Sequence, residues 1–184
     1  MLTPIILQDD PANAPGDDDP DPSRADEPAQ PANLIAVSPD HPQAQPYADW
    51  LAARLAEVIT QLNTPLISLS LALVDDATMA KLHDQYLGDP TTTDVITFDL
   101  ADQPRTIEGE LVLCVDQARR QADLHNHSIE HELLLYAVHG VLHLLGYDDH
   151  DPDQARKMHA EEDRLLTLIG VGPVYAVQTR NAPG

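Results

Sequence analysis

Apolar positions along residues 34–170 follow two periods, the twofold alternation of half-buried strands and the three-to-four spacing of amphipathic helices. Strands are predicted by alternation or by β-branched residues at 34–37, 67–73, 93–98 and 110–115. Helices are predicted by apolar stripes at 46–62, 77–87, 117–124, 129–145 and 152–169. This order predicts an α+β fold, in which a small mixed β-sheet of about four strands is packed with about five helices.

Short polar side chains mark where several of these helices should begin. Asp76, Asp116 and Ser128 each precede an apolar stripe and have the side-chain oxygens that cap the first backbone N–H groups. Asp151 is followed by a proline at the first helical position, which suits the start of the last helix.

The two ends of the chain differ in composition from the middle. Residues 1–33 contain seven prolines and eight acidic residues but one basic residue, which predicts a disordered acidic leader. Ile5, Ile6 and Leu7 form an apolar run within it that is long enough only for a short strand. Residues 171–184 are predicted to be a loose C-terminal tail, so residues 34–170 form the expected folded domain.

Charge and cysteine content limit the classes of protein that fit. The chain has 31 acidic and 10 basic residues, and residues 34–184 alone carry a net charge of about −14. Such a surface is poor for general binding to nucleic-acid phosphates, DNA included. The single cysteine, Cys114, excludes an internal disulfide and indicates a reducing compartment. No apolar stretch approaches the ~20 residues that cross a membrane, and we expect a cytoplasmic protein.

The most informative stretch is H-G-V-L-H-L-L-G-Y-D-D-H at residues 139–150. His139 and His143 are four residues apart, which places both imidazoles on one face of a helix. That helix is apolar nearly all round and should be the central helix of the fold, where two unpaired imidazoles would be costly to bury. Gly146 should end it, so that the returning loop adds a third ligand. The pattern predicts an open zinc site, one ion per chain, with water in the fourth position.

The third ligand and the chemistry are less constrained by spacing. Asp149 is favoured by its distance from Gly146, and His150 is the alternative ligand or a proton-transfer group. Zinc proteases of the H-E-x-x-H type use a glutamate directly after the first histidine, and here that position is Gly140. The missing base disfavours peptide hydrolysis, whereas zinc and its water can still act on a phosphodiester.

The 139–150 motif resembles the signature of the YbeY endoribonucleases, and other stretches match in the same order. Residues 86–88 and 93–98 are similar to the family's Y-R-G and T-D-V-L-S-F blocks, and 109–114 is similar to its G-D-I-x-I strand. Met158 and Glu162 match an M-x3-E pattern, and Glu132 precedes the metal motif as in many members. The resemblance covers about residues 34–170.

The resemblance implies a zinc-dependent, single-strand-specific endoribonuclease that matures the 3′ end of 16S ribosomal RNA and serves ribosome quality control. His139 and His143 would act through the metal. Either the metal's water attacks phosphorus, or the metal activates a neighbouring 2′-hydroxyl. Implied partners are single-stranded precursor RNA and, to deliver it, small-subunit ribosomal proteins or an assembly GTPase. Two alternatives stay open: a zinc-stabilised, non-catalytic ribosome-associated factor, and a metallohydrolase of another substrate class.

Three residues depart from the family pattern. The arginine implicated in handling the RNA phosphate is Leu87, which cannot make charge-assisted hydrogen bonds. Arg105 is a candidate replacement, although a solvated loop arginine is the simpler interpretation. The aspartate of the G-D-I block is Glu110, which keeps the charge but moves it by one methylene.

Overall fold

The computed structural model describes residues 6–8 and 34–176, and the rest of the chain lies outside the described residues. The strands are β1 (Ile6–Gln8), β2 (Ile35–Ser38), β3 (Leu66–Val74), β4 (Val95–Asp99) and β5 (Ile107–Cys114). The helices are α1 (Gln45–Leu62), α2 (Asp76–Leu87), α3 (Val115–His125), α4 (Ile129–Leu144) and α5 (Pro152–Leu168). This is the predicted α+β fold with a mixed sheet.

The sheet has the strand order β1-β4-β5-β3-β2. Strands β2, β3 and β5 run parallel to one another, whereas β4 is antiparallel to β5. The longest pairing joins β3 to β5, from Leu66 opposite Ile107 to Val74 opposite Cys114. The carboxyl ends of β3 and β5 therefore lie side by side, and α2 and α3 begin there.

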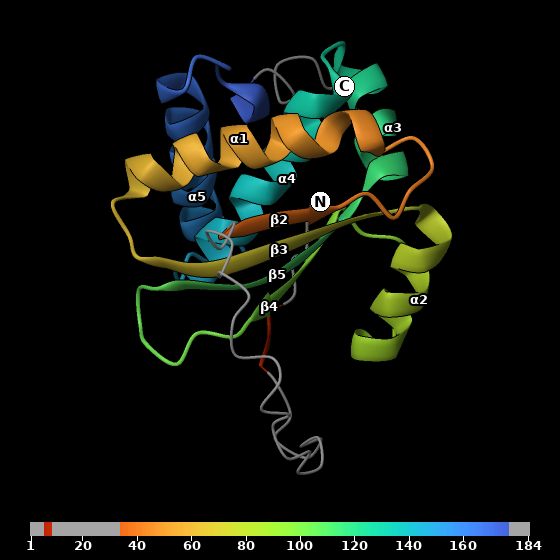
Figure 1. The fold of residues 1–184 in the computed structure, drawn as a ribbon, viewed down its shortest axis with the longest axis horizontal. Coiled ribbons are helices and arrows are strands. Elements are labelled where there is room, and N and C mark those ends of the chain that lie inside the picture. The colour runs from red at the N-terminus through yellow and green to blue at the C-terminus, as the bar shows by residue number, and fades with distance from the viewer. Residues whose placement is uncertain (1–5, 9–33, 177–184) are drawn as a thin grey trace, which may run out of the picture.

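The helices cover the two faces of the sheet unequally. Helices α1, α3, α4 and α5 lie on one face, and α2 lies on the other (Figure 1). The main core joins the sheet to the four-helix face, with leucines of α1 and α4 among its fully buried members. A smaller cluster joins α2 to the opposite face, where Met79 packs on Val74, Ile96, Val112 and Cys114.

Helix α4 is the central element of the fold, as its apolar sequence predicts. Every residue from Glu132 to Leu144 is buried, and α4 contacts α1, α3, α5, β4 and β5. Gly140 allows this close approach to the sheet, because a Cβ there would lie 2.7 Å from Cδ2 of Leu111 and 3.0 Å from Oγ1 of Thr97. A larger side chain at this position would push α4 away from the sheet.

The helix starts are partly as predicted. The side chains of Ser128 and Asp151 cap α4 and α5, accepting backbone N–H groups within the first turn. The prediction for α2 was wrong by one residue, since Asp75 is the cap and Asp76 already lies in the first turn. Asp116 also lies inside its helix, and its carboxylate instead accepts the backbone N–H of Asp76 at 3.1 Å.

Both predicted terminal segments contain residues that the structure describes. Ile6–Gln8 pairs in parallel with β4 and adds a fifth strand to the four we predicted, because a short segment can use the open hydrogen-bonding edge of β4. Residues 171–176 are not loose: Val174 is buried, and the Asp163 carboxylate accepts the N–H groups of Tyr175 and Ala176. The remainder of the predicted leader and tail lies outside the described residues.

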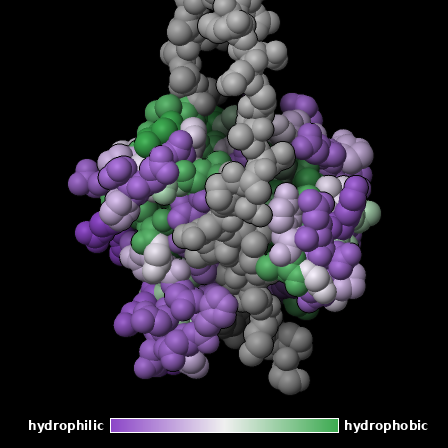
Figure 2. All heavy atoms as spheres, turned by 90° about the horizontal axis from the view of Figure 1, so that it is seen from below, coloured by the Kyte–Doolittle hydropathy of each residue, from purple (hydrophilic) through white to green (hydrophobic). Residues whose placement is uncertain are grey.

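On the face shown in Figure 2, most of the coloured surface is hydrophilic, and hydrophobic side chains are gathered in small patches. Within the described residues, no helix combines the length and the apolar character needed to cross a membrane.

Candidate metal centre

The structure brings His139 and His143 together near the end of α4. Their Nε2 atoms lie 3.1 Å apart, and both side chains are buried. The Nδ1 atom of His139 lies 2.6 Å from Oε1 of Glu162, and Nδ1 of His143 lies 2.9 Å from the carbonyl oxygen of Tyr147. A carboxylate and a carbonyl only accept hydrogen bonds, so each Nδ1 carries the proton and each Nε2 presents a lone pair.

The loop after α4 brings Asp149 to these lone pairs. The helix ends at Leu144, and Gly146 turns the chain with a φ of +86°, a value that suits glycine. Oδ2 of Asp149 then lies 3.9 Å from Nε2 of His139. One ligand atom from each of His139, His143 and Asp149 lies within 4.8 Å of the others.

His150 lies outside this group. Its side chain is 68% exposed, whereas that of Asp149 is 6% exposed, and its Nδ1 bonds to Oδ1 of Asp148 at 2.5 Å. Asp148, Asp149 and His150 also lie close to one another, in a group that shares Asp149 with the histidine pair. Of the two third ligands that the sequence allowed, the geometry supports Asp149.

The donor set of His139, His143 and Asp149 fits a zinc ion. Two imidazole nitrogens and a carboxylate oxygen converge, and none of the three atoms carries a proton when the tautomers are those fixed by Glu162 and Tyr147. Such lone pairs repel one another unless a cation or a proton lies between them. Two histidines with one carboxylate are also a common ligand set for zinc with an open fourth position.

Burial and nearby charges shift the pKa values of the two histidines in opposite directions. Burial lowers the pKa of His143 to about 4, and the neighbouring His139 adds to the effect. Burial also opposes protonation of His139, but Glu162, Asp94 and Asp149 outweigh it and raise the pKa of that imidazole. Without metal, protonation is therefore easier at His139 than at His143.

Gly140 explains why no glutamate follows the first histidine. Its Cα faces the sheet, where Leu111 and Thr97 leave no room for a side chain. The general base of an H-E-x-x-H protease could not be placed here without moving α4.

Two residues beside the site were not singled out from the sequence. His159, on α5, bonds through Nδ1 to Oε2 of Glu162 at 2.9 Å, and its spacing of three from Glu162 is the signal that could have revealed it. Asp94 precedes β4 and is buried, which raises its pKa, and among the described residues its Oδ2 has no hydrogen-bond partner.

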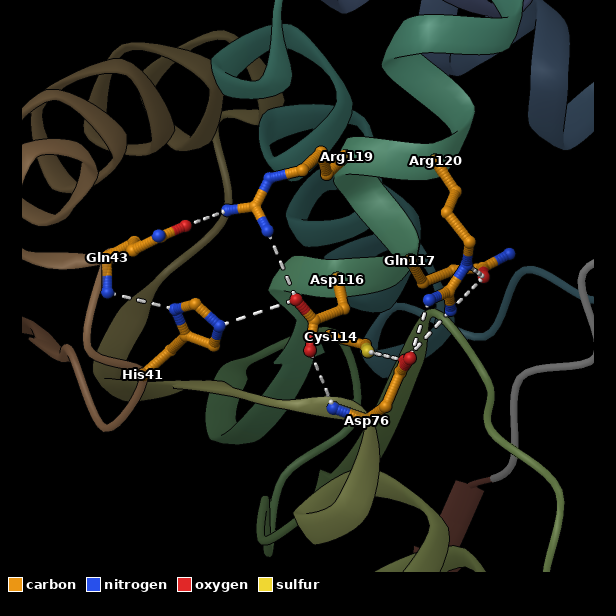
Figure 3. A network of polar contacts seen from close by, with 8 residues as sticks. All are labelled: His41, Gln43, Asp76, Cys114, Asp116, Gln117, Arg119 and Arg120. Atoms are coloured by element: carbon orange, nitrogen blue, oxygen red, sulfur yellow. Dashed lines mark hydrogen bonds and ion pairs between the residues drawn. The ribbon is translucent and has the colours of Figure 1, made fainter.

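Arginines on α3 and α5 bond to carboxylates of their own chain. Figure 3 shows Arg120 bonded to both carboxylate oxygens of Asp76, and Arg119 bonded to Asp116 and Gln43. This network lies where α2 and α3 begin, and Arg156 on α5 likewise pairs with Asp153. These arginines hold carboxylates of their own chain, which reduces what they can offer to phosphate.

The three residues that depart from the family pattern lie on different elements. Leu87 is half-buried at the end of α2, Glu110 is exposed on β5, and Arg105 is exposed between β4 and β5 with a φ of +60°.

Sequence comparisons identify the family. A family model described as Endoribonuclease YbeY matches residues 38–170. The chain is 44% identical over 114 residues to an Endoribonuclease YbeY of Frankia alni, which covers 55% of this chain and 63% of the relative. It is 42% identical over 133 residues to that of Mycobacterium tuberculosis, which covers 66% of this chain and 75% of the relative. For Frankia alni and Frankia casuarinae, the match spans less than two thirds of the relative's length.

A solved structure shares the fold. The solution structure of TM1509 from Thermotoga maritima superposes with a TM-score of 0.51 and 20% identity, over 73% of this chain and 91% of that one. The fold and the buried histidine pair are those of an α+β protein with a candidate metal centre. The chain belongs to the YbeY family.

Proposed function

We propose that this protein is a zinc-dependent endoribonuclease that cleaves single-stranded RNA, with one zinc ion per chain held by His139, His143 and Asp149. The observation that carries the proposal is the convergence of ligand atoms from His139, His143 and Asp149, in a segment that matches the Endoribonuclease YbeY family model. The folded domain of residues 34–170 would hold the whole site.

The residues around the site have separable tasks. A bound zinc ion would supply Lewis acidity toward water and toward a phosphoryl oxygen. Glu162 and the Tyr147 carbonyl fix the tautomers of His139 and His143, so that both Nε2 atoms face the same point. Gly140 keeps α4 against the sheet, and His139 is 1% exposed, which limits the access of bulk water to that side of the site.

The substrate that we propose is precursor 16S ribosomal RNA near its 3′ end, in the cytoplasm. The net charge of −21 and the internally paired arginines argue against tight binding of naked RNA by this chain alone. A basic small-subunit ribosomal protein, or an assembly GTPase, would present the RNA, because an acidic surface favours a basic partner.

A second candidate is a zinc-stabilised ribosome-associated factor without catalytic activity. The observation that favours it is Leu87 at the position of the family's arginine, half-buried and without charge. This factor would bind zinc and co-sediment with ribosomal particles but would not cut RNA.

The test is cleavage of a labelled single-stranded RNA beside its duplex, with and without a zinc chelator. The His139→Ala variant, purified in the same way, controls for contaminating nucleases. The proposal predicts chelator-sensitive cutting of the single strand that is absent from the variant. Equal cutting by wild type and variant would overturn the nuclease assignment, and no cutting by a zinc-loaded wild type supplied with ribosomal particles would favour the second candidate.

A further inference from the structure

A buried carboxylate behind the candidate metal centre connects it to the C-terminal end of the fold. Glu162 lies on the inner face of α5 with no solvent exposure. Its Oε1 accepts from Nδ1 of His139 at 2.6 Å, and its Oε2 accepts from Nδ1 of His159 at 2.9 Å. Burying a lone carboxylate is costly, and two imidazole N–H donors offset that cost.

We propose that Glu162 is the positioning residue of the metal centre, and that His159 and Tyr175 fix Glu162 in place. The inference rests on the proposed zinc site, because it assigns a role toward that metal. Glu162 holds the proton of His139 on Nδ1, which directs the Nε2 lone pair toward His143 and Asp149. A carboxylate behind a metal-binding histidine also makes the imidazole a stronger ligand.

The geometry around His159 explains how Glu162 is itself held. The His159 ring stacks on the Tyr175 ring with centroids 3.7 Å apart and planes at 11°. The His159 ring is also nearly parallel to that of His139, at 17° and 6.2 Å. His159 can therefore rotate away from Glu162 only if Tyr175 moves.

Tyr175 is in turn fastened to α5 by its backbone. The Asp163 carboxylate accepts the N–H of Tyr175 at 2.9 Å and that of Ala176 at 3.0 Å, and Val174 is buried in the main core. Asp163 directly follows Glu162. One turn of α5 therefore holds His139 through Glu162 and the C-terminal segment through Asp163. The route from the segment to the site is Tyr175, His159, Glu162 and His139.

The same atoms argue against a different interpretation of this cluster, as a second metal site. His139, His159 and Glu162 are close enough to be a ligand set of their own. However, both Nδ1 atoms already lie at hydrogen-bond distance from the carboxylate, and His139 would have to bind two ions through its two nitrogens. A stoichiometry of two zinc ions per chain, with one lost on removing His159, would overturn the positioning role.

The test measures zinc affinity by competition with a chromogenic chelator, well below the unfolding temperature. Three variants of the full chain are compared with wild type: Glu162→Gln, His159→Phe, which keeps a ring against Tyr175, and Tyr175→Leu. Glu161→Gln is the matched control, because Glu161 is the adjacent glutamate and pairs with Arg164 at the surface. The absorption spectrum of the cobalt-substituted protein reports the ligand geometry independently of activity.

We expect Glu162→Gln to weaken zinc binding by roughly 10–100-fold and to change the cobalt spectrum, as loss of an outer carboxylate does at other sites. His159→Phe and Tyr175→Leu should weaken binding by smaller factors in the same direction, and Glu161→Gln should leave it unchanged. Wild-type affinity in Glu162→Gln, accompanied only by a lower melting temperature, would overturn the positioning role while leaving the zinc site intact. A wild type that binds no zinc would overturn both the inference and the proposed function.

Discussion

Oδ2 of Asp149 lies 3.9 Å from Nε2 of His139, while the next residue, His150, is turned outward to Asp148. The side chain of Asp149 is 6% exposed and that of His150 is 68% exposed, so of the two only Asp149 faces the buried histidine pair. The turn at Gly146 determines which of the two residues does so.

Zinc affinity should therefore depend on Asp149 and not on His150. Asp149→Ala removes a ligand, so we expect a loss greater than the roughly 10–100-fold that removal of an outer partner costs. His150→Ala should retain nearly all of the wild-type affinity. Titration of both variants with zinc by isothermal calorimetry checks this, and the reverse ranking would move the third ligand to His150.

Gly140→Ala should destabilise the protein although alanine favours helices. The new Cβ would lie 2.7 Å from Cδ2 of Leu111, which is tighter than van der Waals contact allows. Overpacking of this kind costs about 1–3 kcal/mol, which exceeds the gain of about 1 kcal/mol in helix propensity. Urea unfolding of the zinc-free variant measures the difference, and a variant more stable than wild type would show that α4 tolerates a side chain there.

The stability of the zinc-free protein should depend on pH in a way that reflects the opposite pKa shifts of His139 and His143. A pKa of His139 raised above 6.5 adds stability that is complete below pH 6.5 and is lost as the pH rises through the raised value. A pKa of His143 lowered from 6.5 to about 4 removes stability as the pH falls from 6.5 toward 4. The contribution of the pair should therefore be greatest near pH 6.5.

Denaturant unfolding from pH 4 to 9 measures this contribution, as the difference between wild type and a double variant with His139→Asn and His143→Asn. Saturating zinc should abolish the alkaline loss, because the metal replaces the proton between the two rings. In the zinc-free protein, a stability difference between wild type and the double variant that rises steadily with pH would contradict the opposite pKa shifts of His139 and His143.

Cys114 should be chemically inert in the folded protein. Burial raises the pKa of its thiol to about 12, and its Sγ donates to Oδ1 of Asp76 at 3.2 Å. The thiolate that reacts with disulfide reagents is therefore scarce at neutral pH. A chromogenic disulfide reagent at pH 8 should label no thiol in native protein and one per chain after denaturation; fast labelling of native protein would contradict the burial of Cys114.

Local patterns were enough to predict the parts of the fold that depend on local physics. The apolar stripe of α4, its Ser128 cap and the i, i+4 spacing of His139 and His143 all follow from sequence periodicity, and the structure confirms the helix and the pairing of the side chains. The cap of α2 was assigned to Asp76 instead of Asp75 because two adjacent aspartates offer the same oxygen, and only the backbone conformation separates them.

Contacts between distant segments were not predictable in the same way. His159 and Tyr175 looked like residues of a helix surface and of a tail, and they became part of the site only when α5 packed on α4. The pairing of Ile6–Gln8 with β4 likewise depends on which edge of the sheet is left open, which no local pattern encodes.

The most direct test of the account is to restore activity to chelated protein with measured amounts of zinc, following cleavage of a labelled single-stranded RNA. The account predicts no cleavage without metal and a rate that rises linearly to a plateau at one zinc ion per chain. The same titration of His139→Ala should stay at the background level. Full cleavage by the chelated wild type, or equal restoration in the variant, would contradict the claim that His139, His143 and Asp149 form the catalytic metal centre.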